Sequence, residues 1–289
     1  MKLSTLLRLG RVSNLPTVWT NVLAGVTLGG ASAHSAPERI GLLCGAVSLF
    51  YIGGMYLNDA FDREIDARER PERPIPSGEI SAGAVFAIGY GLLAAGLALV
   101  ALLALSRGGT GWPPVGAALA LGVAIVFYDA YHKDNPLSPV VMGINRVLVY
   151  VLAALSVRAT FTPALLLGCG ALLSYLIGLT YVAKQENLRE VRGMWPLVLL
   201  AVPFAHVQAL QTPTGALLYV MLGAWVAFTL SLILRQQGRD IPRAVGQFIA
   251  GICLLDGLLV AGQGQPVLAA LCIVGFAVTR VFQRRIPGT

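Results

Sequence analysis

Long apolar runs recur along the whole chain and are separated by short polar connections. Runs that approach the roughly 20 residues a helix needs to cross a bilayer fall near residues 14–33, 39–58, 82–106, 113–130, 138–157, 162–183, 195–211, 214–234, 243–262 and 266–283. Proline or glycine at positions 203, 213 and 264 interrupts the last four of these runs. The pattern therefore predicts an all-α, polytopic membrane helical bundle of nine to ten transmembrane helices.

The polar connections differ in length and content on the two sides of the predicted bundle. Those on one side are short, whereas those on the other carry most of the ionisable groups and lie near residues 59–81, 128–138, 184–193 and 235–243. Loops on a rigid scaffold commonly carry function. No soluble domain, low-complexity tract or long linker interrupts the pattern, so we expect one integral-membrane domain over residues 1–289.

Composition and charge support a membrane protein and set its orientation. Of the 289 residues, 56% are hydrophobic and 12% are charged, which is far more apolar than a soluble domain. If all ten segments cross, seventeen Lys and Arg fall on one side and three on the other, which assigns the basic side to the cytoplasm. Orientation and anionic headgroups then account for the net charge of +7, so no nucleic-acid partner is expected. We expect a multi-pass protein of a bacterial inner membrane whose chemistry faces the cytoplasm. The first residues lack the apolar core of a removable signal, so the first span is expected to be retained.

The first candidate site directly follows the second apolar run. Asn58, Asp62 and Asp66 are spaced by four residues, so on a helix each side chain is offset by about 40° and rises about 6 Å. All three then project from one face, where their oxygens suit a hard cation such as Mg²⁺ that is shared with substrate phosphates. Asp59 lies one position off this face. The alternative is a solvated helix end whose acids pair with neighbouring arginines.

A proline-rich segment continues this motif. Three prolines occur within six residues between Arg70 and Ser77, which disfavours a regular helix and stiffens the loop. Arg73 can thus be held near the acidic face, where it could contact a diphosphate oxygen. For Arg68 and Arg70, a simple positive-inside role is at least as plausible as catalysis.

A second acidic pair follows the sixth apolar run. Glu186 and Glu190 are again four residues apart, and Lys184 precedes them. Two carboxylate faces on two helices could bracket two cations around one diphosphate. Taken alone this second motif is weak, because acidic helix ends with neighbouring arginines are common on protein surfaces.

Further polar residues lie at or within the spans. The fourth run ends in Tyr128 to Lys133, and Lys133 is either a diphosphate contact or an ordinary positive-inside lysine. His132 is interpreted as an interfacial polar residue rather than a metal ligand, because no second histidine accompanies it. Arg146 and Asp256 are charges within apolar spans, which makes them functional candidates. They could equally pair with each other for structure.

Taken together, these residues resemble the UbiA superfamily of intramembrane prenyltransferases. The resemblance rests on the region of Arg11 and Asn21, on the Asn58, Asp62 and Asp66 motif with its continuation through Arg73 to Gly78, on the stretch Tyr128 to Lys133, and on the second acidic site. It implies a helical bundle, usually of nine spans, whose central cavity opens to the cytoplasm and laterally to lipid. It also implies Mg²⁺-dependent transfer of an isoprenyl group from a diphosphate donor to a second, often aromatic, acceptor. Two departures are the Glu residues of the second motif, where many members have Asp, and the count of ten apolar segments.

The combined hypothesis assigns a role to each candidate residue. Metal binding is assigned to Asn58, Asp62, Asp66, Glu186 and Glu190; catalysis to Asp62, Asp66 and Lys133; and substrate binding to Asn58, Arg73, Tyr128, Lys184 and Arg146. The expected cofactor is Mg²⁺, and the expected partners are a prenyl diphosphate, a hydrophobic or aromatic acceptor and membrane lipids. The alternatives are a transporter or lipid-binding protein, and a family member that has lost catalysis.

Overall fold

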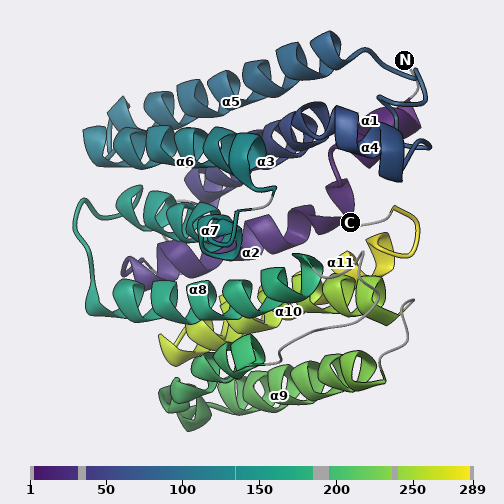
Figure 1. The fold of residues 1–289 in the computed structure, drawn as a ribbon. Helices are drawn as coiled ribbons and strands as arrows, with labels where there is room; N and C mark the ends of the chain where they lie inside the picture. The colour runs from purple at the N-terminus through teal and green to yellow at the C-terminus, as the bar shows by residue number, and fades with distance from the viewer. Residues whose placement is uncertain (1–2, 32–36, 134, 185–194, 236–239, 287–289) are drawn as a thin grey trace.

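The computed structural model describes residues 3–31, 37–133, 135–184, 195–235 and 240–286, and the regular elements in these ranges are all helical (Figure 1). In chain order they are α1 (Leu3–Leu9), η1 (Val12–Asn14), α2 (Leu15–Leu28), α3 (Pro37–Phe61), α4 (Arg63–Glu69), α5 (Ala82–Leu105), α6 (Trp112–Tyr131), α7 (Ser138–Leu155), α8 (Pro163–Lys184), η3 (Trp195–Ala205), η4 (Val207–Gln211), α9 (Pro213–Leu234), α10 (Asp240–Gly262) and α11 (Pro266–Phe282). The all-α fold predicted from the apolar runs is confirmed.

Within the described residues, seven helices are long and apolar enough to cross a bilayer, namely α3, α5, α6, α7, α8, α9 and α10. Three of the expected spans are not long α-helices of this kind. Helix α2 has 14 residues and α11 has 17. The run 195–211 forms the two 3₁₀ helices η3 and η4, with Pro203, which cannot donate a backbone hydrogen bond, inside the first. A total of nine or ten spans therefore stays a prediction.

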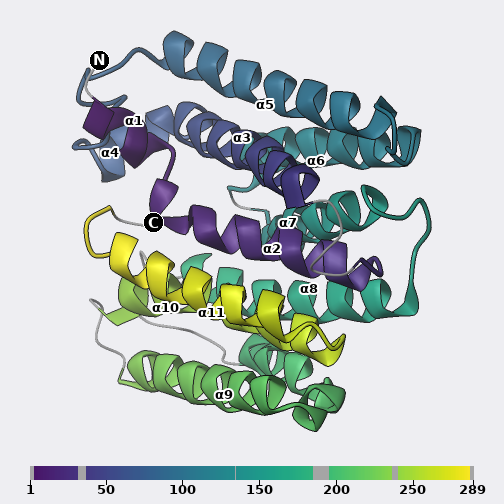
Figure 2. The same cartoon turned by 180° about the vertical axis from the view of Figure 1, so that it is seen from behind.

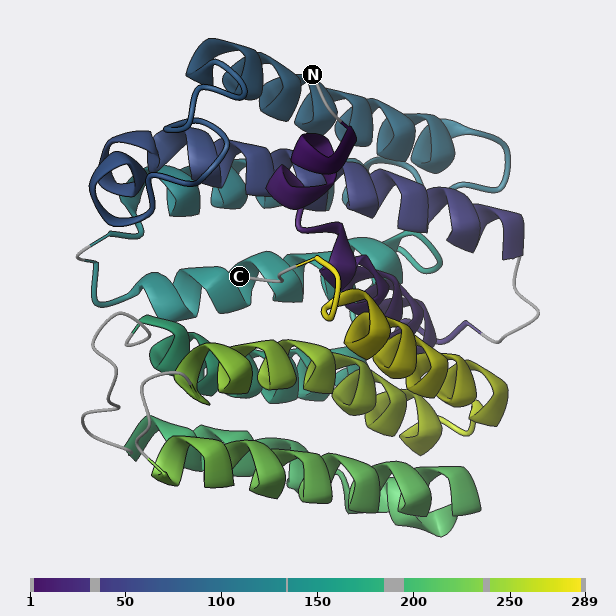
Figure 3. The ribbon, with the colours of Figure 1, turned by 90° about the vertical axis from the view of Figure 1, so that its right-hand side faces the viewer.

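The helices stack in layers, with α5 at one edge and α9 at the other (Figures 1 and 3). Helix α2 lies in the middle, where it contacts α3, α7, α8, α10 and α11. Seen from behind, α11 crosses over α10 beside α2 (Figure 2). Helix α10 is the most enclosed of the seven long helices, because 89% of its most apolar 18-residue segment is buried. Residues of α2 and α10 are thus positioned to meet inside the bundle, although they come from opposite ends of the chain.

Close packing at the centre depends on a small residue at one position. A Cβ atom added to Gly25 of α2 would lie 2.6 Å from the Tyr150 carbonyl oxygen and 2.7 Å from the Ala153 Cβ of α7. Only glycine allows this approach, which is how membrane helices commonly gain packing contacts.

The outer faces are apolar. Large side chains such as Leu102 on α5, Val123 on α6 and Val220 on α9 are more than half exposed. In water this would be a liability, but lipid tails solvate such faces. Together with the seven long apolar helices, this supports an integral, multi-pass membrane protein.

Candidate active site

The acidic motif lies where α3 passes into α4. Asp62 stands between the two helices with helical backbone angles, φ −79° and ψ −3°. Its N–H donates to the Asn58 carbonyl, and the N–H of Asp66 donates to the Asp62 carbonyl, each at 2.9 Å. The helical course therefore continues through the junction. Asn58, Asp62 and Asp66 all line one cavity, as their spacing predicts.

This cavity has a volume of about 230 Å³ and a polar and an apolar part. Besides the motif, its polar lining includes Arg11, Glu69, Arg70, Arg73, Tyr128, Lys133 and Arg146. The apolar lining comes from α8 and α10 and includes Leu176, Leu179, Val245, Ile249 and Ile252. Such a lining suits a molecule with a charged head and a hydrocarbon tail.

Basic side chains already contact the acids. Lys133 Nζ lies 3.3 Å and His132 Nε2 3.6 Å from Asp62 Oδ2. Arg73 Nη1 donates to Asp66 Oδ2 at 2.7 Å and to Asp59 Oδ1 at 3.3 Å. The structure thus brings the predicted Arg73 and Lys133 to the motif.

One further cation escaped the sequence-based assignment of roles. Arg11 Nη2 donates to Asp59 Oδ1 at 3.0 Å and to Asn58 Oδ1 at 3.5 Å. Arg11 has a left-handed backbone with φ 41°, which is rare for a residue other than glycine. Burial lowers the pKa of Arg11, but the combined effect of Asp59 and, to a smaller extent, Tyr51, Asp129 and Asp62 outweighs it and raises the pKa, so this guanidinium stays charged.

The two motif carboxylates have opposite pKa shifts. Burial pushes the pKa of Asp62 upward, but the hydrogen bonds and charges of His132 and Lys133 outweigh it and lower the pKa. Burial likewise raises the pKa of Asp66, and here Arg73 only partly offsets the effect, while Asp59 and Asp62 add repulsion. The pKa of Asp66 therefore lies above its ordinary value despite the 2.7 Å contact. Asp62 is the more strongly acidic of the pair.

The residues of this motif fit a magnesium ion. In the part of the chain that the structure describes, no three His, Cys, Asp or Glu side chains converge on one metal position. The motif itself supplies two carboxylates and one amide to the cavity, and Glu69 also lines it. Mg²⁺ accepts such oxygen ligands, keeps several waters and shares substrate phosphates. The expected second pair, Glu186 and Glu190, lies outside the described residues, so the second metal site stays a prediction.

The structure keeps Lys184 away from the motif. Its ammonium group donates to the Asn135 carbonyl at 2.7 Å and does not line the cavity. Tyr128, by contrast, lines the cavity and stacks on His132, with ring centroids 4.9 Å apart. The structure thus places Tyr128 on the cavity and Lys184 outside it, and a substrate contact of either residue stays a prediction.

Asp129 is a site residue that the sequence reasoning missed. It is 4% exposed, and its Oδ1 accepts a hydrogen bond of 3.2 Å from Asn58 Nδ2. Its Oδ2 has no hydrogen-bond partner among the described residues. A carboxylate inside the apolar run 113–130 was the available signal, because such groups are costly in a membrane.

Asp129 also lines a second, apolar pocket of about 70 Å³. This pocket lies between α2, α3, α6 and α7, and it shares Tyr51, Met55, Tyr128, Met142 and Arg146 with the cavity of the acidic motif. The two spaces adjoin, and the five shared residues form their junction.

Arg146 and Asp256 do not pair directly. Arg146 Nη1 donates to Asn21 Oδ1 at 2.8 Å, and Asn21 Nδ2 donates to Asp256 Oδ2 at 2.8 Å. The Tyr150 hydroxyl donates to Asp256 Oδ1, and the Thr20 hydroxyl donates to Oδ2 at 2.5 Å. The expected pairing is therefore indirect, through an amide of α2.

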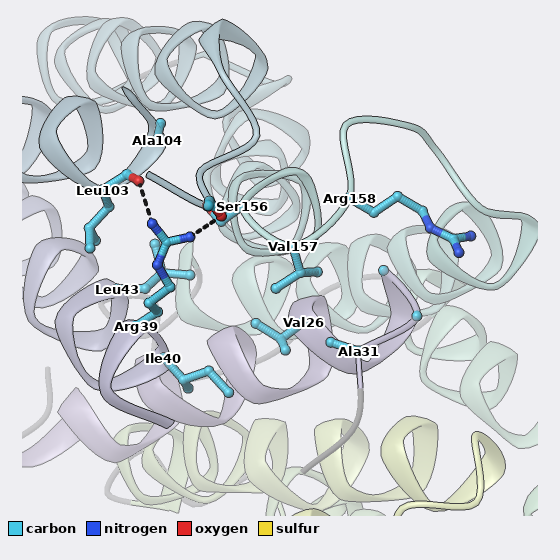
Figure 4. Close-up of a pocket in the computed structure, with 13 residues that line it drawn as sticks. Val26, Ala31, Arg39, Ile40, Leu43, Leu103, Ala104, Ser156, Val157 and Arg158 are labelled. Carbon is cyan, nitrogen blue, oxygen red and sulfur yellow. Dashed lines mark hydrogen bonds between the residues drawn. The ribbon is translucent and has the colours of Figure 1, made fainter. Parts of the chain in front are cut away.

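Another pocket lies at the opposite end of α2 and α3 and has a volume of about 340 Å³ (Figure 4). Arg39 there donates to the carbonyls of Leu103 and Arg107, each at 3.2 Å, which caps the last turn of α5. Arg158 points away from Arg39. Acidic side chains do not line this pocket in the described structure, so the smaller cavity remains the candidate site.

Comparisons with known proteins show the family of this chain. Residues 18–252 match the model of the UbiA prenyltransferase family. Digeranylgeranylglyceryl phosphate synthase of Methanothrix thermoacetophila is 35% identical over 134 residues, which is 46% of this chain and 47% of the relative. Chloroplastic chlorophyll synthase of Arabidopsis thaliana is 29% identical over 203 residues, covering 66% of this chain and 51% of the relative. The chain thus spans about half the length of these two relatives.

Solved structures match over nearly the whole chain. A UbiA homologue from Aeropyrum pernix aligns with a TM-score of 0.65 at 15% identity, covering 91% of this chain and 96% of the other. A UbiA homologue from Archaeoglobus fulgidus, solved with DMAPP and Mg²⁺, aligns with a TM-score of 0.54 at 17% identity, covering 96% and 99%. At such identities these matches speak for the fold alone. Because the family model covers most of the sequence, this chain belongs to the UbiA prenyltransferase family.

Proposed function

We propose that this protein transfers an isoprenyl group from a prenyl diphosphate to a hydrophobic acceptor inside the membrane, in a reaction that requires Mg²⁺. The observation that carries the proposal is the single cavity that joins the Asn58, Asp62 and Asp66 motif to an apolar interior. The DMAPP and Mg²⁺ in the Archaeoglobus fulgidus neighbour support this donor class and this metal.

The ion pairs of the acidic motif support a role for a metal. The carboxylates of Asp59, Asp62 and Asp66 are paired with Arg11, Arg73 and Lys133. A bare diphosphate would meet repulsion from these acids, and these three bases already contact them. When bound, Mg²⁺ would neutralise the diphosphate and stabilise it as a leaving group.

The basic side chains bind and orient the donor. As the diphosphate enters, Lys133 and Arg73 exchange part of their contact with Asp62 and Asp66 for contact with phosphate oxygens. Charge-assisted hydrogen bonds of this kind are the strong ones. The acids then become available to the metal, so donor and metal binding are coupled through these four side chains.

The interior shelters the developing allylic cation. Tyr128 and Tyr51 lie at the junction of the two spaces, where an aromatic face can stabilise positive charge. Leu176, Ile249 and Ile252 form an apolar wall that receives the hydrocarbon chain and excludes water. The acceptor nucleophile attacks C1 of the donor as the bond from C1 to the diphosphate oxygen breaks.

The names of the relatives favour other acceptors than the aromatic acceptor expected from the sequence. A glycerophosphate-type lipid is favoured by the name of the Methanothrix relative, whereas the plant relative favours a tetrapyrrole. We infer that the cavity faces the cytoplasm, because the basic loops flank it. A bacterial inner membrane has no support from the relatives, which are mostly archaeal.

A transporter is the less favoured alternative. An ion path needs an ionisable group that can release its partners near the bilayer midplane. The candidate for that role, Asp256, is fully buried and holds hydrogen bonds on both carboxylate oxygens.

The test is diphosphate release by the full-length protein in membranes. Dimethylallyl, geranyl, farnesyl and geranylgeranyl diphosphates are supplied with and without Mg²⁺, and with geranylgeranylglyceryl phosphate, 4-hydroxybenzoate or a tetrapyrrole carboxylic acid as acceptor. Wild type is compared with Asp62→Ala and with Glu64→Gln, a control that removes a carboxylate 78% exposed at its side chain. Transfer that requires Mg²⁺ and is lost only in Asp62→Ala supports the proposal. Mg²⁺-dependent donor binding without transfer to any acceptor would indicate a non-catalytic member.

A further inference from the structure

Arg146 is a buried cation at the junction between the cavity and the apolar pocket. Its residue is 8% exposed, and it lines both spaces. A charge so deep in a helical bundle is costly unless it is paired or serves a ligand. The donor reaction described above engages Lys133 and Arg73 and leaves Arg146 without a task.

Most of the hydrogen-bonding capacity of this guanidinium is unused. A guanidinium carries five N–H donors. In the described part of the chain two are engaged, by Asn21 Oδ1 at 2.8 Å and Thr17 Oγ1 at 3.1 Å. The Tyr51 ring covers one face, with its centroid 5.6 Å from the guanidinium carbon. The other three N–H groups have no acceptor among the described residues, and the residue lines the cavity.

Asp256 positions the Arg146 guanidinium through Asn21 and forms no hydrogen bond with it in the described structure. Asn21 Nδ2 donates to Oδ1 and Oδ2 of Asp256 at 3.0 and 2.8 Å, which fixes the orientation of the amide. The amide oxygen therefore faces Arg146. Asp256 supplies a compensating negative charge at one remove, and Thr20 and Tyr150 complete its hydrogen bonds.

The depth of Arg146 separates it from the diphosphate. Tyr51, which the guanidinium covers, precedes Asn58 by seven residues on α3, and this corresponds to about 10 Å along the helix. Arg11, Arg73 and Lys133 surround the motif itself. A second anion at Arg146 would thus be separated from a diphosphate at the motif by about two turns of α3.

We infer that Arg146 binds an anionic group of the acceptor, a phosphate or a carboxylate, and that Asp256 and Asn21 are positioning residues that aim its guanidinium into the cavity. This inference rests on the proposed prenyl transfer for the identity of the ligand as acceptor. It adds a requirement that the transfer reaction alone does not impose, namely negative charge on the acceptor.

Matched acceptor pairs test the charge requirement. The full-length protein is assayed with geranylgeranylglyceryl phosphate against uncharged geranylgeranylglycerol, and with 4-hydroxybenzoate against phenol. The two pairs distinguish a phosphate from a carboxylate. Acceptor KM and kcat are measured, donor binding is titrated, and binding of each acceptor is followed by thermal stabilisation, which does not need turnover.

The variants are Arg146→Gln, Arg146→Lys, Asp256→Asn and Asn21→Ser, with Asp240→Asn as control. Asp240 is also buried and ion-paired, at 3.5 Å from Arg243, but it lines neither space. Arg146→Gln should raise the KM for the anionic acceptor about 10- to 100-fold, the range expected for hydrogen bonds to a charged group. The uncharged acceptor should change little, and Arg146→Lys should restore part of the preference. Asp256→Asn should act in the same direction by a smaller factor, with donor affinity unchanged.

Different results would overturn different parts of the inference. If Arg146→Gln still prefers the anionic acceptor, Arg146 does not bind the anionic group of the acceptor. If the variant loses only donor affinity, Arg146 binds the diphosphate instead. If Asp256→Asn and Asn21→Ser both keep the preference for the anionic acceptor, these two residues do not position Arg146. If Asp256→Asn does not fold, Asn21→Ser alone decides this point. Absence of transfer in wild type would refute the proposed function, while the binding comparison would still decide whether Arg146 selects anions.

Discussion

Asn58 and Asp129 join the acidic motif to the neighbouring helix. The Asn58 amide donates to one carboxylate oxygen of Asp129 at 3.2 Å, while the other oxygen of Asp129 lacks a partner within the described structure. This contact fixes the orientation of the first residue of the motif. It also buries a carboxylate near the like charges of Asp59 and Asp62.

Removal of the Asp129 carboxylate should weaken donor binding without destabilising the protein. Asp129→Ala frees the Asn58 amide, and loss of such a supporting partner typically costs 10- to 100-fold in metal affinity. Asp129→Asn removes a buried charge while keeping the side-chain volume, so its melting temperature should be at or above that of wild type. Titration of a prenyl diphosphate at several Mg²⁺ concentrations and a thermal melt check both parts. A large drop in melting temperature with unchanged donor affinity would show that the contact is structural.

The opposite pKa shifts of Asp62 and Asp66 predict opposite effects on stability in the absence of metal. The folded pKa of Asp62 is lowered, so this group stabilises the protein above its unfolded pKa near 4, and that contribution is lost as pH falls through the folded pKa. The folded pKa of Asp66 is raised, so its ionisation costs stability as pH rises from about 4 through the folded value.

At neutral pH, Asp62→Asn should therefore lower the melting temperature, whereas Asp66→Asn should leave it equal or raise it. The melts are run between about pH 2.5 and pH 8, because the Asp62 contribution is lost below pH 4, and a chelator is present so that no divalent cation binds. Asp62→Asn should also flatten the acid side of the profile. A decrease of similar size in both variants would contradict the assigned shifts.

Lys133 and Lys184 form a matched pair of lysines. Lys133 contacts Asp62 at 3.3 Å and lines the cavity, whereas Lys184 donates to a loop carbonyl outside it. Lys133→Gln should weaken Mg²⁺-dependent donor binding about 10- to 100-fold, as expected for a lost hydrogen bond to a charged group. Lys184→Gln should change it less than threefold. Equal losses in the two variants would restore Lys184 to the substrate-binding set that the sequence predicts.

Gly25 should not tolerate a side chain. Its added Cβ would lie 2.6 Å from the Tyr150 carbonyl oxygen, so α2 and α7 must move apart in Gly25→Ala. Such overpacking costs about 1–3 kcal/mol, and the displacement also moves Asn21 relative to Arg146. Gly116→Ala is the control, because nothing lies within 4 Å of its added Cβ. Thermal melts of the two variants should differ by several degrees, and equal melting temperatures would contradict close packing at this point.

The sequence predicts local features of the site better than long-range ones. Helical spacing correctly places Asn58, Asp62 and Asp66 on one cavity, and the prolines beyond them correctly indicate that Arg73 can return to the motif. Both arguments use residues within one or two turns of each other. The role of Asp129 depends instead on how α6 faces α3, across 71 positions of sequence.

The same limit applies to the centre of the bundle. Arg146 and Asp256 are recognisable as buried charges, but Asn21 bridges them from a helix 235 positions away from Asp256 in sequence. A pattern of apolar residues indicates that a helix is buried, but it does not indicate which polar groups of other helices it contacts. The run 195–211 shows a different limit, because its composition suits an α-helix while its backbone forms two 3₁₀ helices around Pro203 and His206.

The ion pairs around the acidic motif have a further consequence for the membrane itself. A water-accessible hollow between transmembrane helices is a potential leak, since unbalanced charges within it would recruit ions from solution. Here Asp62 and Asp66 are already contacted by Lys133 and Arg73. The protein thus supplies its own counter-ions to these two carboxylates, so neither needs an ion from solution.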